Sequence, residues 1–294
     1  MKSDTLYKLI ISSTILASLF AAGCDKVSYP AHDQKIVVEG WIEDGAEPIV
    51  IVTSTIPITY EYQDISDLSD YVLRWAKVTV SGPDGDIILT GRKSSEYFPP
   101  YIYTTTKMKG KAGESYRLRV DYGDEHVEAI TSIPQPAQLA GLRAEKMSEG
   151  SDKYRIIAYV EDDPSTKNHY RFFVKIHGKD STYKPSFMGL FDDGLLTQPI
   201  NEISVCRGMQ APIDTFEPYY DEGDSVDVKF VTMDEEMFAY WSDYEDISMF
   251  ARNPFFHCTS PIRTNINGGL GYWAGYGASI YRIKIPSDQR EGNE

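Results

Sequence analysis

Short runs of alternating hydrophobic and polar residues, separated by turn signals, fill residues 35–134. Successive side chains of a β-strand point to opposite faces, so this alternation is typical of strands with one buried face. Gly82-Pro83-Asp84-Gly85 is one of the separators, since proline presets a turn and glycine accepts positive φ. The pattern predicts seven strands, at residues 35–42, 49–55, 76–80, 86–90, 101–106, 115–121 and 126–132. Seven short strands in about 100 residues indicate an immunoglobulin-like β-sandwich over residues 35–134.

A proline-rich segment, Ile133-Pro134-Gln135-Pro136, follows the last of these strands. Each proline removes a backbone donor and favours extended chain, so the segment predicts a stiff connector between two modules. We expect a second, β-rich module over residues 137–286 and a flexible tail over residues 287–294. Its predicted strands are at residues 153–161, 169–177, 201–207, 225–232 and 278–285. Asp162-Asp163-Pro164-Ser165 is expected to join the first two of them as a hairpin.

One α-helix is predicted in the second module, near residues 234–249. Thr232-Met233-Asp234-Glu235 fits a capping box, in which the threonine hydroxyl and the glutamate carboxylate satisfy the first backbone amides. Hydrophobic residues then recur at spacings of three and four, at Met237, Phe238, Trp241, Tyr244 and Ile247 or Phe250. Acidic residues are expected to face away, at Glu236, Asp243 and Glu245. We interpret the hydrophobic stripe as packing of the helix on a sheet, with a ligand platform as the alternative. The fold class is therefore mainly all-β, with one packed helix.

Residues 56–75 form an insertion longer than an ordinary hairpin loop. Leu68, Val72 and Trp75 are spaced by four and three, which fits a short amphipathic turn packed on the edge of the sandwich. The alternative is a partner-facing surface formed by three tyrosines of the insertion. These are Tyr60, Tyr62 and Tyr71.

The N-terminus has the pattern of a secretory leader. Lys2 and Lys8 precede an apolar run of about fourteen residues, which is shorter than the ~20 needed to cross a bilayer. The run ends in Ala22-Gly23-Cys24, where small residues before a cysteine are typical of the processing site of a bacterial lipoprotein. We therefore expect residues 1–23 to be a cleaved signal peptide, Cys24 to carry lipid, and residues 24–34 to be a tether.

Composition narrows the classes of partner. The net charge of −15 would repel nucleic acid and anionic lipid, so neither is an expected partner.

Apart from Cys24, the cysteines are Cys206 and Cys258, and an even pair in an exported protein predicts one disulfide. Two buried free thiols are the alternative.

Known catalytic and metal-binding motifs do not explain the chain. Gly269-Leu270-Gly271-Tyr272-Trp273-Ala274 matches the dinucleotide fingerprint, but no βαβ unit surrounds it. We interpret its glycines as sites of tight turns and close backbone approach, with aromatic residues packed over them. The alternative is an exposed aromatic surface for sugar rings, made of Tyr272, Trp273 and Tyr276. The histidines show no metal-ligand spacing, so no catalytic residue, metal or cofactor is expected.

Four segments together resemble a known family. They are Val37-Val38-Glu39-Gly40-Trp41-Ile42, Trp75-Ala76-Lys77-Val78-Thr79-Val80-Ser81, Tyr116-Arg117-Leu118-Arg119-Val120, and the glycine- and aromatic-rich stretch from Thr264 to Gly277. In these the chain is similar to the Bacteroidetes lipoprotein family known as domain of unknown function 4249, over nearly all of its length after the leader. The resemblance implies a lipid-anchored outer-membrane protein, commonly encoded beside a TonB-dependent receptor.

The resemblance further implies an accessory role in nutrient capture or receptor gating, and it supplies no catalytic residues. A glycan or a peptide is the expected ligand. Which face of the outer membrane carries the protein stays open. Two other functions stay open as well: a structural or adhesive surface lipoprotein without a transporter, and a carbohydrate-active enzyme with an unrecognised site.

Overall fold

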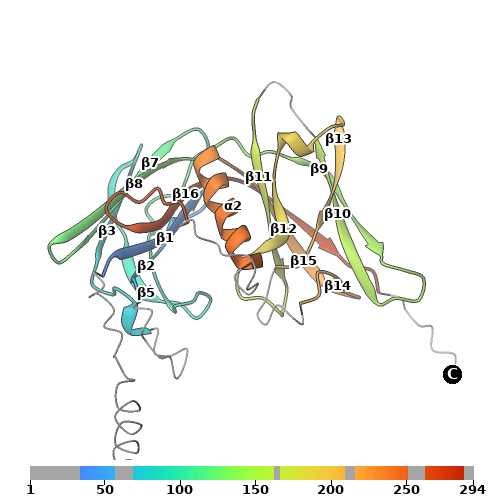
Figure 1. Cartoon of the computed structure of the whole chain (residues 1–294), viewed down its shortest axis with the longest axis horizontal. Helices are drawn as coiled ribbons and strands as arrows, with labels where there is room; N and C mark the ends of the chain where they lie inside the picture. The colour runs from blue at the N-terminus through green and yellow to red at the C-terminus, as the bar shows by residue number, and fades with distance from the viewer. Residues whose placement is uncertain (1–33, 57–68, 162–165, 209–215, 251–261, 288–294) are drawn as a thin grey trace, which may run out of the picture. The chain divides into compact units, whose positions relative to one another are not determined.

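The computed structural model describes residues 34–56, 69–161, 166–208, 216–250 and 262–287, with the side chain of Phe250 left out. All helices and strands given below belong to one unit, formed by residues 35–56 and 62–294. The structure is mostly strand with one long helix among the described residues (Figure 1), which confirms the predicted fold class.

All seven strands predicted for the first module are present. They are β1 (Ile36–Glu43), β2 (Ile49–Ser54), β3 (Lys77–Gly82), β4 (Gly85–Ile88), β6 (Tyr101–Thr104), β7 (Ser115–Tyr122) and β8 (Glu125–Ser132). The sequence pattern missed β5 (Thr90–Lys93), which pairs only with β6 at the edge of a sheet. Its four residues have no buried side chain, so backbone pairing rather than hydrophobic alternation defines it.

The second module contains the five predicted strands and three more. The predicted ones are β10 (Lys153–Glu161), β11 (His169–Ile176), β13 (Ile200–Val205), β15 (Ser225–Met233) and β16 (Leu270–Lys284). The others are β9 (Leu139–Lys146), β12 (Lys184–Asp192) and the two-residue β14 (Tyr220–Asp221), with a short 3-10 helix, η2 (Asp193–Leu195), after β12. The predicted hairpin is wrong, because β10 pairs with β9, β13 and β14, whereas β11 pairs with β12 and β15.

The strands form one large sheet and two small ones. The large sheet has eight strands in the order β12-β11-β15-β16-β1-β2-β6-β5. One small sheet is β4-β3-β7-β8, and the other is β13-β10-β14 with β9 also paired to β10. Strands of both predicted modules belong to the large sheet. The boundary at residues 134–136 stays a prediction.

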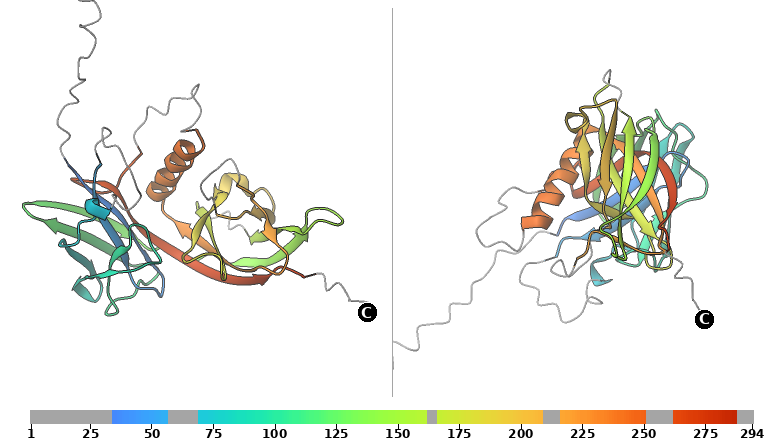
Figure 2. Two further views of the ribbon diagram at one scale, coloured as in Figure 1. Left: turned by 90° about the horizontal axis from the view of Figure 1, so that it is seen from below. Right: turned by 90° about the vertical axis from the view of Figure 1, so that its right-hand side faces the viewer.

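Strand β16, the long red strand of Figure 2, connects the two halves of the large sheet. Its first half runs parallel to β1, from Leu270 opposite Val37 to Tyr276 opposite Glu43. Its second half runs antiparallel to β15, from Gly277 opposite Thr232 to Lys284 opposite Ser225. The tight turns expected of the glycine-rich segment are wrong from Leu270 onward, where the segment is a strand. Directly before it a turn is present, since the amide of Gly269 donates to the carbonyl oxygen of Ile266 at 3.3 Å.

Close backbone approach, the other role expected of these glycines, is confirmed. Gly271 has φ +97°, and a Cβ atom there would lie only 1.8 Å from the carbonyl oxygen of Val38. A Cβ on Gly275 would lie 2.3 Å from the carbonyl oxygen of Ser132. Only a residue without a side chain lets β16 lie this close to its neighbours.

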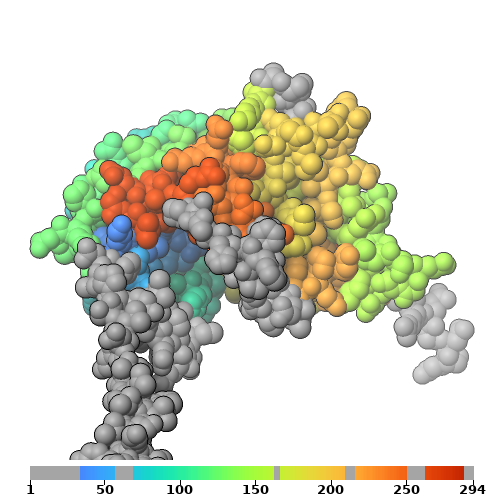
Figure 3. Space-filling view, viewed as in Figure 1, coloured from blue at the N-terminus to red at the C-terminus, as the bar shows by residue number. Residues whose placement is uncertain are grey.

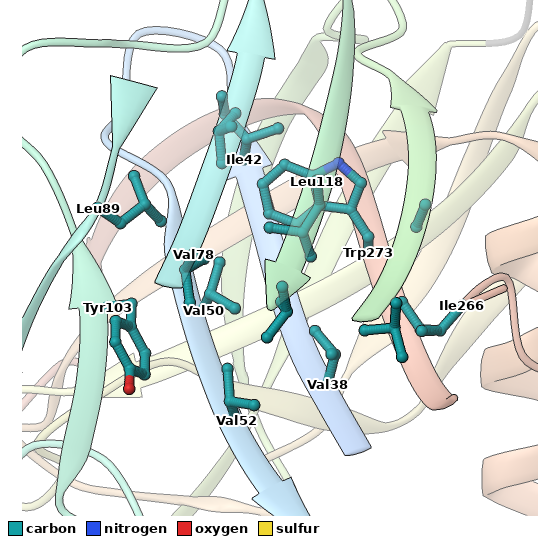
Figure 4. Packing of buried hydrophobic residues seen from close by; sticks show 14 of the residues in the cluster. Val38, Ile42, Val50, Val52, Val78, Leu89, Tyr103, Leu118, Ile266 and Trp273 are labelled. Atoms are coloured by element: carbon teal, nitrogen blue, oxygen red, sulfur yellow. The ribbon is translucent and has the colours of Figure 1, made fainter. Parts of the chain in front are cut away.

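Each face of the large sheet has its own core. On one face, Val38 and Ile42 of β1 pack with residues of β3, β7 and β8 (Figure 4), which makes the first module a β-sandwich. On the same face, Val228 and Phe230 of β15 pack with residues of β10 and β13. On the opposite face a third core gathers residues of β11, β15, β16 and the helix. The large sheet is therefore covered by two small sheets on one side and by the helix on the other.

The helix α2 (Glu235–Phe250) confirms the predicted helix and lies against β11, β12 and β16 (Figure 1). Met237 and Trp241 are buried in the third core, as the packing interpretation expected. The capping box is wrong in detail: the carboxylate of Asp234 accepts from the amide of Met237 at 2.8 Å. The hydroxyl of Thr232 accepts from the amide of Ala137 at 3.1 Å, because Thr232 lies within β15.

Glu245 and the insertion also differ from expectation. Glu245 was expected to face away from the sheet, but its carboxylate pairs with Arg171 of β11 at 2.9 Å. In the insertion, Val72 and Leu73 are buried, whereas Trp75 is 90% exposed and does not pack on the edge of the sandwich. The reason is local, since Val72 forms an isolated bridge with Thr53 instead of continuing a helical turn.

Candidate functional site: an aromatic cleft

A cleft of about 950 Å³ lies on the face of the large sheet that also carries α2. Its floor comes from alternate residues of β1, β2, β11, β15 and β16, and its walls from α2 and the loops at residues 95–100 and 181–183. Alternation explains the floor: Glu39, Trp41 and Glu43 of β1 line the cleft, because Val38 and Ile42 point into the sandwich core. We call this site the aromatic cleft. Figure 3 shows the orange surface of α2 next to red residues near the start of β16.

Eight aromatic residues of the described ranges line the aromatic cleft. They are Trp41, Tyr97, Phe98, Phe173, Tyr183, Trp241, Tyr272 and Tyr276. Ring centroids are 5.9 Å apart for Trp41 and Tyr97, and 5.6 Å apart for Trp241 and Tyr272. The indole nitrogen of Trp241 donates to the hydroxyl of Tyr276 at 2.9 Å. These contacts fix the rings of the wall relative to one another.

Glu39 is the carboxylate at the centre of this aromatic floor. Its Oε1 atom accepts a hydrogen bond of 3.1 Å from the hydroxyl of Tyr272. Glu39 stays open to water in the cleft, but the surrounding protein restricts hydration of its charged form and raises the pKa of Glu39. Burial likewise raises the pKa of Tyr272, with a further contribution from the Glu39 charge. At neutral pH the tyrosine is therefore the donor and Glu39 the acceptor.

A second carboxylate, Glu43, forms a buried ion pair with Lys229. The Lys229 Nζ atom lies 2.5 Å from Oε1 of Glu43, and both side chains are about nine-tenths buried. The same ammonium lies 4.4 Å from the centroid of the Tyr183 ring and 5.4 Å from that of Phe173. Lys229 is thus held by a carboxylate and by two aromatic rings.

The lining of the aromatic cleft is acidic. Besides Glu39 and Glu43 it contains Glu47 and Glu96, and Lys229 is the one lysine or arginine among the lining residues that the structure describes. Because Glu43 neutralises Lys229, the remaining carboxylates are left without a balancing cation of the lining. Such a surface disfavours anionic ligands.

Arg171 packs against Trp241, a wall residue of the cleft, without itself lining the cleft. Its guanidinium carbon lies 4.2 Å from the centroid of the Trp241 ring, and the side chain is 1% exposed. Burial lowers the pKa of Arg171, and the neighbouring Glu245 carboxylate opposes that shift. The guanidinium stacked on Trp241 therefore holds the ring that forms one wall of the cleft.

The structure separates the residues that the sequence proposed as a binding surface. Tyr272 and Tyr276 line the aromatic cleft, while Trp273 is fully buried in the sandwich core. Tyr71 is half-buried and is not among the cleft residues. Tyr60 and Tyr62 lie outside the described residues.

The predicted cysteine chemistry is mostly outside the described residues. Cys24 and Cys258 both lie there, so lipidation and the disulfide stay predictions. Cys206 is half-buried and has no disulfide partner among the described residues, and burial raises the pKa of its thiol.

The sequence reasoning missed the residues that define the site, namely Glu39, Trp41, Glu43 and Lys229. One signal was present in β1, where Glu39, Trp41 and Glu43 alternate with buried residues and so share a face. Another was in β15, where Asp227 and Lys229 alternate with Val226, Val228 and Phe230 and so share a face. In both strands, charged residues lie on a face of the sheet that is expected to be buried.

Two kinds of site are absent from the described ranges. No three or more histidine, cysteine, aspartate or glutamate side chains there are grouped to hold a metal ion. Nor does any helix in those ranges have the length and apolar character needed to cross a membrane.

Comparison with known families gives one result. A family model described as a domain of unknown function (DUF4249) matches residues 25–282. This range covers the helix α2 and all the strands given above, apart from the last two residues of β16. The comparison with curated proteins finds no match.

Proposed function

Because the chain belongs to the family described as DUF4249, whose description assigns no activity, we propose a function from the aromatic cleft itself. The protein is a non-catalytic, lipid-anchored outer-membrane protein that captures a small ligand in this cleft. It delivers the ligand to a TonB-dependent receptor during nutrient uptake. The cleft is the observation on which the proposal depends.

The dimensions and chemistry of the aromatic cleft support ligand capture. Its volume of about 950 Å³ is at the upper end of the ~300–1,000 Å³ typical of small-molecule sites. Such sites combine mostly apolar or aromatic walls with a few fixed polar groups. Here the floor belongs to a sheet with cores on both faces, so the rings are held in place before a ligand arrives.

The proposed anchor fits the position of the first strand. Ile36, where β1 begins, is twelve positions after Cys24. Twelve residues reach at most about 40 Å when extended, so the tether allows the cleft to stand off the membrane and reach a neighbouring receptor. A cysteine with several acyl chains gives stable attachment, whereas one chain binds only marginally.

The experiment uses the intrinsic fluorescence of the two cleft tryptophans. Nutrient extract is fractionated, and each fraction is added to the detergent-extracted lipoprotein. We expect one class of fraction to shift the emission of wild type, because Trp41 and Trp241 line the cleft. Trp41→Ala should weaken this binding at least tenfold, since stacking area at the floor is lost.

The matched control is Trp75→Ala, which removes a tryptophan that is 90% exposed and is not a cleft residue. Its binding should equal that of wild type. The partner is tested by extracting the lipoprotein in detergent and asking whether a TonB-dependent receptor co-purifies with it. Equal binding by wild type and Trp41→Ala would refute the cleft as the capture site. Failure of the receptor to co-purify would favour a structural or adhesive role.

A further inference from the structure

The geometry points to a ligand class for the aromatic cleft: small molecules that carry a primary ammonium group, bound by Glu39 among the rings of the cleft. This inference rests on the proposed capture function and makes it specific. It predicts selection against molecules of the same shape whose ammonium is replaced by a hydroxyl or a carboxylate.

The cleft already holds one ammonium of its own. Lys229 places its Nζ atom 2.5 Å from a Glu43 carboxylate oxygen and 4.4 Å from the centroid of the Tyr183 ring. Although desolvating an ammonium is costly, this one is buried in the cleft floor at 7% exposure. The Lys229 site therefore shows that carboxylate and aromatic faces combine here into a setting for an ammonium.

Glu39 also offers a carboxylate, but none of the described residues supplies a cation to pair with it. Its hydrogen-bond partner is the neutral hydroxyl of Tyr272, and no lysine, arginine or histidine of the described ranges pairs with it. The Tyr272 ring stands 4.8 Å from that of Tyr240 and 5.6 Å from that of Trp241. Glu39 is thus bonded to a tyrosine whose ring belongs to an aromatic cluster, whereas Glu43 is paired with an ammonium that lies over two rings.

The surrounding charge supports a cation over the alternatives. The other acidic residues of the lining, Glu47 and Glu96, add to the negative potential around Glu39. Lys229 does not offset them, because it is paired with Glu43. A carboxylate or phosphate ligand would be repelled, and a neutral sugar would gain nothing from this charge.

Proton linkage supplies a signature that a neutral ligand lacks. The surrounding protein restricts hydration of the charged form of Glu39 and raises its pKa, so part of its population is protonated at a pH where an ordinary glutamate is fully charged. An ammonium favours the charged form, so its binding releases a proton from Glu39. The affinity should therefore increase as the pH rises through the elevated pKa of Glu39.

The test uses three probes with one indole ring and different charges: tryptamine, tryptophol and indole-3-acetate. Binding to the detergent-extracted full chain is measured by calorimetry, in two buffers of different ionisation enthalpy to count released protons. We expect tryptamine to bind at least tenfold more tightly than tryptophol, and indole-3-acetate to bind least. Maltotriose serves as the neutral sugar probe.

Variants then assign the preference to Glu39. Glu39→Gln should reduce the preference for tryptamine over tryptophol to less than threefold and abolish proton release. Glu39→Asp keeps the charge and should retain the preference, which separates loss of charge from loss of fold. Glu149→Gln, at an exposed turn outside the cleft, should behave as wild type.

Each other outcome overturns the inference. Equal binding of tryptamine and tryptophol, or an unchanged preference in a folded Glu39→Gln variant, refutes the role of charge. Binding of maltotriose but not tryptamine refutes the ligand class, yet leaves capture by the cleft intact. Absence of binding by all four probes also refutes the ligand class, while the fluorescence experiment with Trp41→Ala decides separately whether the cleft captures anything.

Discussion

The buried ion pair of Lys229 and Glu43 decides the charge of the cleft at the residue scale. Both side chains are about nine-tenths buried, so each charge depends on the other for the solvation it has lost. Removing one partner leaves an uncompensated buried charge, whereas removing both leaves none. Substitutions in this pair therefore test the charge balance of the cleft floor without a ligand.

Lys229→Met should destabilise the protein by about 3–5 kcal/mol, measured by denaturant unfolding, because Glu43 stays buried without its cation. The double variant Lys229→Met with Glu43→Gln should recover most of this loss. Lys167→Met, which breaks an exposed pair with Glu235, should cost about 0–1 kcal/mol. A loss of similar size in the single and double variants would show that packing of Lys229, and not its charge, matters.

Single side chains of the cleft were only partly predictable. Tyr272 and Tyr276 were candidates from their spacing around glycines, but the same reasoning included Trp273, which points to the opposite core. Alternation in a strand separates such residues only once the strand itself is recognised. The glycines suggested turns, so the two faces of this segment were not distinguished.

At the scale of elements, strands with clear alternation were predicted and the others were not. β9 contains alanine and glycine, and β12 contains Pro185 and a register shift in its pairing with β11. Neither has the pattern of β-branched and aromatic residues that marks a strand. The wrong hairpin has a related cause. Seven of the eight residues of β11 are buried on its two faces, so the sequence does not reveal which neighbour it pairs with.

The junction of β16 with β1 provides a prediction at this scale. Gly271→Ala would place a Cβ atom 1.8 Å from the carbonyl oxygen of Val38, in a residue whose φ is +97°. Steric overlap with backbone and the unfavourable φ together should cost roughly 3 kcal/mol or more in unfolding free energy.

The matched control is Gly45→Ala, since Gly45 has φ +75° but open space around its Cβ position. It should lose only about 1–2 kcal/mol, the cost of the left-handed conformation. If both variants lose the same amount in urea unfolding, close approach of β16 to β1 is not what requires glycine at residue 271.

At the scale of the whole molecule, the site depends on contacts between distant parts of the sequence. Glu39 and Tyr272 are 233 positions apart, yet the parallel pairing of β1 with β16 brings them into hydrogen-bond distance. The pattern of single strands predicts their number and burial but not which strands become neighbours. The fold class was therefore accessible from the sequence, whereas the cleft was not.

The proposed anchor separates attachment from capture in the whole molecule. Cys24→Ser removes the thiol that takes lipid, so the variant should lose its acyl chains and keep an intact leader in mass spectrometry. It should also leave the stable outer-membrane fraction, because no other membrane anchor is proposed. Binding in the aromatic cleft should stay unchanged, since the first cleft residue, Glu39, is fifteen positions further along the chain. Cys206→Ser is the control, and it should remain acylated and membrane-bound. Retention of Cys24→Ser in washed outer membranes, with the leader removed, would contradict attachment through this cysteine.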